Sequence, residues 1–131
     1  MTTITAALDL RADFLSLLEE AAAAHANIVQ LRLDGVAAIM ETLATGTVVA
    51  RAEGRLADCA QMLPAIFALA DGLADYTYGD NRSTRMTGEK APLPPGVAMV
   101  FLQFFPARDG QRHLVARITY DGDTCCGTCG G

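Results

Sequence analysis

Residues 97–120, which read VAMVFLQFFPARDGQRHLVARITY, decide the predicted fold because they form the clearest β-hairpin pattern in the chain. The run 97–105 is apolar apart from Gln103, as in a strand whose two faces are both buried. A turn follows at 108–111, where the sequence reads Arg-Asp-Gly-Gln. We expect the first strand of this hairpin to be internal in a sheet and the second to lie nearer an edge.

The second strand of the hairpin alternates between two sets of side chains. The apolar set comprises Leu114, Ala116, Ile118 and Tyr120. The opposite set comprises His113, Val115, Arg117 and Thr119. Because His113 shares its face with polar neighbours, we expect it to be a surface histidine.

Two earlier segments have the spacing and composition of helices. Thr5–Ala24 places apolar residues at intervals of three and four, and Arg55–Tyr76 does the same. Pro64 either kinks the second helix or begins a new one, because proline removes a helical hydrogen bond. His25 follows the first helix, where it favours the negative end of the helix dipole. Cys59 lies on the apolar stripe, so we expect a buried, unreactive thiol.

The region between these helices contains strands. Ile28–Leu33 alternates with period two, and Thr47–Arg51 is a short β-branched run. Between them, Asp34-Gly35 forms a turn. Residues 36–44 fit either a short helix or a second strand, and their Ala, Met, Glu and Leu content favours the helix.

This order of elements predicts a single α+β domain over residues 1–123. Its sheet is antiparallel or mixed, two main helices pack on one face, and a β-hairpin ends the domain. Residues 124–131 form a separate cysteine- and glycine-rich tail.

The segment 77–96 is rich in glycine, proline and other turn-forming residues, so we expect a long loop. It carries three cations on an otherwise acidic chain: Arg82, Arg85 and Lys90. The segment is either a solvated connector or a loop that binds an anion or a protein partner.

The tail carries the only obvious chemistry in the sequence. Cys125, Cys126 and Cys129 place three thiols within five residues, with the Cys-x-x-Cys spacing that suits one tetrahedral metal or a small disulfide. Three thiolates favour zinc or another thiophilic ion. A fourth ligand would come from His25, Cys59, His113, a carboxylate or a second subunit.

Composition limits the remaining classes of function. The net charge of −5 argues against a nucleic-acid binder, which needs a basic face. No signal peptide or membrane-spanning segment is apparent, which favours a cytoplasmic protein with reduced thiols. The phosphate-loop, metalloprotease and nucleophile-elbow motifs are all missing, so we expect a protein that is not an enzyme.

Two functions follow from these features. The first is a small thiol protein whose tail binds a soft metal or undergoes thiol–disulfide chemistry. The second is an interaction or assembly subunit, such as a phage or virion component, an inhibitor or a small acidic chaperone. In that case the 77–96 loop and an exposed sheet edge would contact a protein partner or a second copy of the chain.

Overall fold

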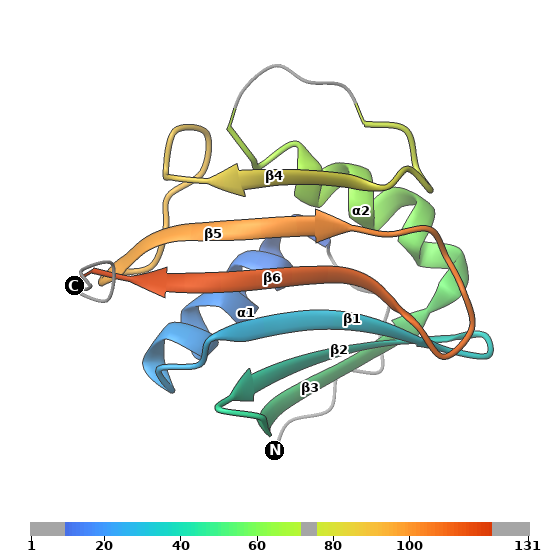
Figure 1. Cartoon of the computed structure of the whole chain (residues 1–131), viewed down its shortest axis with the longest axis horizontal. Helices are drawn as coiled ribbons and strands as arrows, with labels where there is room; N and C mark the ends of the chain where they lie inside the picture. The colour runs from blue at the N-terminus through green and yellow to red at the C-terminus, as the bar shows by residue number, and fades with distance from the viewer. Residues whose placement is uncertain (1–9, 72–75, 122–131) are drawn as a thin grey trace.

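The protein is an α+β domain built on a single antiparallel sheet of six strands (Figure 1). The computed structural model describes residues 10–71 and 76–121, with side chains from Phe14 onward in the first of these ranges. The elements in chain order are α1 (Leu10–Ala23), β1 (Ile28–Asp34), β2 (Ala37–Ala44), β3 (Thr47–Arg55), the 3-10 turn η1 (Leu56–Asp58), α2 (Cys59–Phe67), β4 (Arg82–Met86), β5 (Val97–Phe104) and β6 (Arg112–Tyr120).

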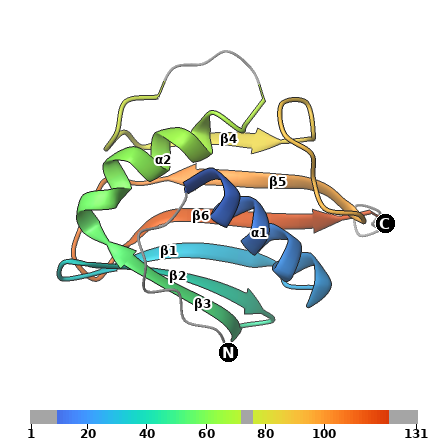
Figure 2. The same ribbon diagram turned by 180° about the vertical axis from the view of Figure 1, so that it is seen from behind.

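The strands follow the order β3-β2-β1-β6-β5-β4 across the sheet. Each half of the sheet is a set of sequential antiparallel neighbours, and β1 joins the two halves by pairing with β6. Both helices lie on one face of the sheet, as the reverse view shows (Figure 2). The opposite face, called the open face below, carries neither of the two helices that the structure describes.

The core lies between the helices and the sheet. On β1, Val29, Leu31 and Leu33 are buried, so Gln30 and Arg32 project toward the open face. The same alternation buries Val100, Leu102 and Phe104 of β5. The largest helix side chains that meet them are Phe14, Leu18, Met62, Leu63 and Ile66.

Residues 36–44 are not a helix as expected: Val36 lies in a turn, and Ala37–Ala44 form strand β2, which pairs with β1 and β3 through its two edges. A two-residue turn at Gly35 and Val36 makes this possible, with Gly35 at φ +63°. Ala38 and Met40 are buried in the core, and Ile39 is buried on the open face. Pairing on both sides outweighs the weak strand propensity of these residues.

Three further expectations were wrong. The 77–96 segment is not wholly a loop, because it contains β4, which pairs with β5. The second strand of the hairpin, β6, is not near an edge, because β1 occupies its other side. The predicted helix Arg55–Tyr76 is too long, because α2 spans only Cys59–Phe67. Of the two alternatives left open for Pro64, the start of a new helix is excluded, since Pro64 lies inside α2.

Candidate partner-binding surface

The edge strand β4 carries two of the three cations predicted to bind a partner. Arg82 and Arg85 are both exposed on β4, and Lys90 is exposed in the turn that follows. Arg85 lies opposite Phe101 on the open face, whereas Arg82 lies opposite Phe104 on the helix-covered face. Arg82 and Arg85 therefore lie on the outermost strand but on opposite faces, and Lys90 follows four residues after the end of β4.

A hydrogen-bonded clamp fixes the carboxyl end of β4. The amide of Asp71 donates to the carbonyl of Arg85 at 2.9 Å, and the Asp71 carboxylate accepts bonds from the amide and the hydroxyl of Thr87 at 3.1 and 2.5 Å. The hydroxyl bond from Thr87 is the main reason that the pKa of Asp71 lies below its ordinary value. The end of β4 is thus tied to the segment that follows α2.

On the open face, an aromatic ring lies between two arginines. The register places Phe101 of β5 opposite Arg85 of β4 on one side and opposite Arg117 of β6 on the other. Phe101 is half-buried, and both arginines are exposed. Neither guanidinium has an ion-pair partner within residues 10–71 and 76–121.

The rest of the open face carries charges that pair with one another. Glu41 accepts hydrogen bonds from Gln30 at 3.3 Å and from Arg32 at 3.4 Å. Burial alone would raise the pKa of Glu41, but these bonds and the nearby guanidiniums outweigh it and lower the pKa. Arg51 lies 3.8 Å from Glu53. Arg85 and Arg117 are therefore open-face cations without an ion pair to any described side chain.

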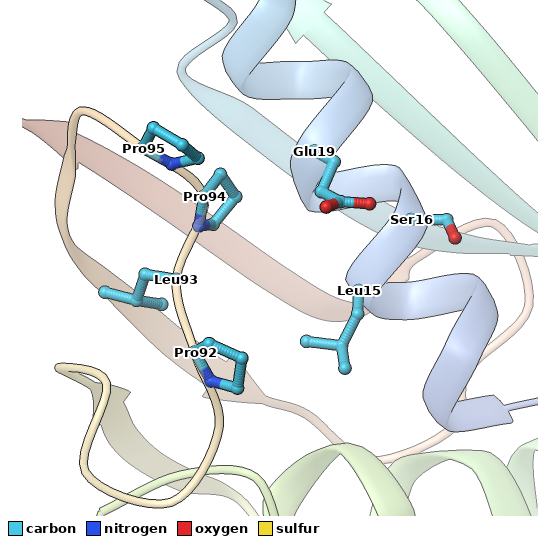
Figure 3. Close-up of a pocket in the computed structure, with 7 residues that line it drawn as sticks. All are labelled: Leu15, Ser16, Glu19, Pro92, Leu93, Pro94 and Pro95. Carbon is cyan, nitrogen blue, oxygen red and sulfur yellow. The ribbon is translucent and has the colours of Figure 1, made fainter.

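The proline-rich end of the 77–96 segment packs against α1. Pro92, Leu93, Pro94 and Pro95 lie along one side of a shallow hollow of about 370 Å³. Leu15, Ser16 and Glu19 of α1 lie along the other side (Figure 3). Within this part of the segment Ala91 and Pro94 are buried and Leu93 is half-buried, whereas Pro92 and Pro95 are exposed like most of β4 and the turn at Lys90.

His113 is not on the surface as expected but is fully buried. It is the extra residue of a β-bulge, because Leu31 pairs with Leu114 and Arg32 pairs with Arg112. Its Nδ1 contacts the carbonyl oxygen of Phe105, and its Nε2 lies 3.0 Å from the hydroxyl of Tyr78. Burial lowers the pKa of His113, and the bond to Phe105 offsets part of that effect.

The prediction that Cys59 is buried is confirmed. Burial, followed by the charge of Asp58, raises the pKa of Cys59 to about 11. Such a thiol is neither a good nucleophile nor a ready metal ligand. The other predicted ligands, Cys125, Cys126 and Cys129, lie outside the described residues, and the described part of the chain holds no group of three or more His, Cys, Asp or Glu placed to bind a metal.

No known family model matches the chain, and no curated protein is significantly similar to it. Among the described residues, no helix has the length and apolar character needed to cross a membrane.

Proposed function

We propose that this chain is a non-enzymatic binding module that takes up an extended, acidic segment of a protein partner along β4. The observation that carries the proposal is that β4 ends the sheet, so its outer side has no neighbouring strand in the described part of the chain, although near its carboxyl end the carbonyl of Arg85 is already bound by the amide of Asp71. An edge strand presents unpaired backbone N–H and C=O groups, which an added strand can satisfy. The exposed cations Arg82, Arg85 and Lys90 along this edge favour a negatively charged partner.

The opposite edge of the sheet suits strand addition less well. The β2–β3 register shifts between Thr42 and Leu43, which marks a bulge in β3. A bulge interrupts the regular row of backbone groups and increases the local twist. The charged side chains Arg51 and Glu53 also pair with each other on β3 and so offer no net charge for recognition.

A matched pair of peptides tests this function. A fluorescent peptide of alternating valine and glutamate is expected to bind, whereas its valine–lysine counterpart is not. Arg85→Glu is expected to weaken binding by about tenfold or more, because it replaces an attractive contact with a repulsive one. Fluorescence anisotropy gives both affinities.

Arg51→Glu is the control, because it makes the same charge change on the opposite edge. A site on β4 would be contradicted if Arg85→Glu and Arg51→Glu lowered the affinity for the valine–glutamate peptide equally. It would also be contradicted if the valine–glutamate and valine–lysine peptides bound with equal affinity. Concentration-dependent dimerisation abolished by Val49→Lys on β3 would point instead to self-association through that edge.

We propose metal binding by the tail as a second function, because one candidate for the fourth ligand lies beside Tyr120, one of the last described residues before the tail. His25 is exposed and stacks on Tyr120 with a ring separation of 4.1 Å. Cys125 follows Tyr120 by five residues, a span of at most about 18 Å. Cys59 and His113 are poor alternatives, since one is a buried thiol and the other uses both ring nitrogens in hydrogen bonds.

Zinc titration of the reduced protein tests this second function. We expect one zinc ion to bind per chain. Cys126→Ser or His25→Ala should each weaken zinc binding by about a hundredfold, because each variant removes one of the four ligands of a tetrahedral site. Cys59→Ala removes the fourth thiol without touching the cluster and should leave the affinity unchanged. A protein that binds no stoichiometric zinc, or a His25→Ala variant with unaltered affinity, would contradict this assignment.

A further inference from the structure

A polar hollow lies at the end of the sheet where β5 turns into β6. Its volume is about 350 Å³, near the lower end for small-molecule sites. Asn81, directly before β4, forms part of its wall, and the connection between β5 and β6 supplies the rest: Phe105, Pro106, Arg108, Gln111 and Arg112. This site is separate from the outer edge of β4.

The charge of the hollow is opposite to that of the chain. Two guanidiniums and two carboxamides line it and no carboxylate does, although the chain as a whole has a net charge of −5. Neither Arg108 nor Arg112 has an ion-pair partner in the described part of the chain. Unpaired guanidiniums beside amide donors form a suitable environment for an oxyanion.

The loop that carries these groups is held in place by backbone bonds. Gly110 donates to the carbonyl of Leu33 at 2.9 Å, and Leu33 donates to the carbonyl of Gln111 at 3.0 Å. Asp109 is the acidic residue of this loop, and its carboxylate accepts a bond from the amide of Gly35 at 2.6 Å. A loop fixed in this way loses little conformational freedom when a ligand binds.

Phe105 and Pro106 supply the apolar part of the lining. Phe105 is half-buried, and its backbone is anchored on both sides, because its amide donates to the carbonyl of His113 at 3.0 Å and its carbonyl contacts the His113 ring. A planar apolar group could pack here while an attached oxyanion reaches the guanidiniums.

We infer that this hollow binds a small organic oxyanion, a phosphate monoester or a carboxylate, that carries a planar apolar group. Arg108 and Arg112 hold the oxyanion, Asn81 and Gln111 donate further hydrogen bonds, and Phe105 and Pro106 contact the apolar group. The site does not depend on strand addition at β4.

Titration of the ¹⁵N-labelled protein with phenyl phosphate, benzoate and inorganic phosphate tests the inference. We expect saturable shifts of the amides of residues 81, 105 and 107–112, with phenyl phosphate or benzoate binding at least about tenfold more tightly than inorganic phosphate. If phenyl phosphate binds more tightly than benzoate, the site prefers a phosphate monoester, and if benzoate binds more tightly, it prefers a carboxylate.

Arg108→Gln and Arg112→Gln are each expected to weaken binding by about tenfold, because each removes a charge-assisted hydrogen bond. Arg117→Gln removes the same charge from the open face and should leave the affinity unchanged. The inference is overturned if no probe saturates, if inorganic phosphate binds as tightly as both aromatic anions, or if Arg117→Gln weakens binding as much as the other two variants.

Discussion

Replacing Phe104 with alanine is expected to destabilise the protein by about 3–5 kcal/mol, a large share of the stability of an ordinary domain. The Phe104 side chain is fully buried on β5. Its ring centroid lies 4.9 Å from that of Tyr76 and 5.5 Å from that of Phe67. Truncation would remove these aromatic contacts and leave a cavity between the sheet and α2. Urea denaturation followed by circular dichroism measures the loss.

Phe101 provides the matched control, since it is the same residue type on the same strand but on the open face. Because Phe101 is only half-buried, Phe101→Ala should cost no more than about 1 kcal/mol. Similar losses for the two variants would mean that both rings are equally buried and would contradict the assignment of the helix-covered and open faces.

Strands whose two faces differ in environment could be predicted from the sequence. The alternation over Ile28–Leu33 arises because one face meets the core, and the structure buries Leu31 and Leu33 as that pattern requires. On β6 the apolar set is buried as predicted, but Val115 and His113 of the opposite set are buried as well. The α+β class followed from these segments together with the helical spacing near Phe14.

Strands defined by backbone pairing alone could not be predicted in the same way. β4 reads Arg-Ser-Thr-Arg-Met, and only Met86 is buried. Its strand character comes from pairing with β5, which no local pattern records. The prediction of a helix over residues 36–44 was wrong for a related reason. Strand pairing on both edges outweighs the low strand propensity of this alanine-rich segment.

The candidate site was only partly predictable. Sequence reasoning identified Arg82, Arg85 and Lys90 as cations on an acidic chain, but it did not show that two of them lie on an edge strand. The hollow near Arg108 and Arg112 was missed entirely. These residues appeared as part of a hairpin and its turn, and their proximity to Asn81 arises only from the tertiary fold.

The prediction that His113 lies on the surface was wrong because a β-bulge at this residue was not foreseen. The burial of its ring makes the stability of the protein depend on pH. A carbonyl can only accept a hydrogen bond, so the ring must donate from Nδ1 to Phe105. The neutral ring then accepts at Nε2 from the hydroxyl of Tyr78. Because burial lowers the pKa of this histidine, the folded protein keeps the ring neutral at a pH where the unfolded chain already binds a proton.

We therefore expect the free energy of unfolding to fall as the pH drops below about 6.5, the ordinary pKa of histidine. Between that value and the lower pKa of the folded state, the unfolded chain binds one more proton than the folded protein. The histidine contribution consequently falls by up to about 1.4 kcal/mol per pH unit and becomes constant once both states are protonated. Above pH 6.5 this contribution is fully present.

Urea denaturation of the wild type and of His113→Asn between pH 7.5 and 5 isolates this effect from that of the carboxylates, which both proteins share. Asparagine keeps a donor near the position of Nδ1 but has no group that titrates in this range. The difference between the two stabilities should narrow on acidification, and ring ¹⁵N chemical shifts should show the proton on Nδ1 at neutral pH. Parallel pH profiles, or a ring protonated on Nε2 alone, would contradict the buried neutral histidine, because either result would require His113 to contact solvent or a different partner.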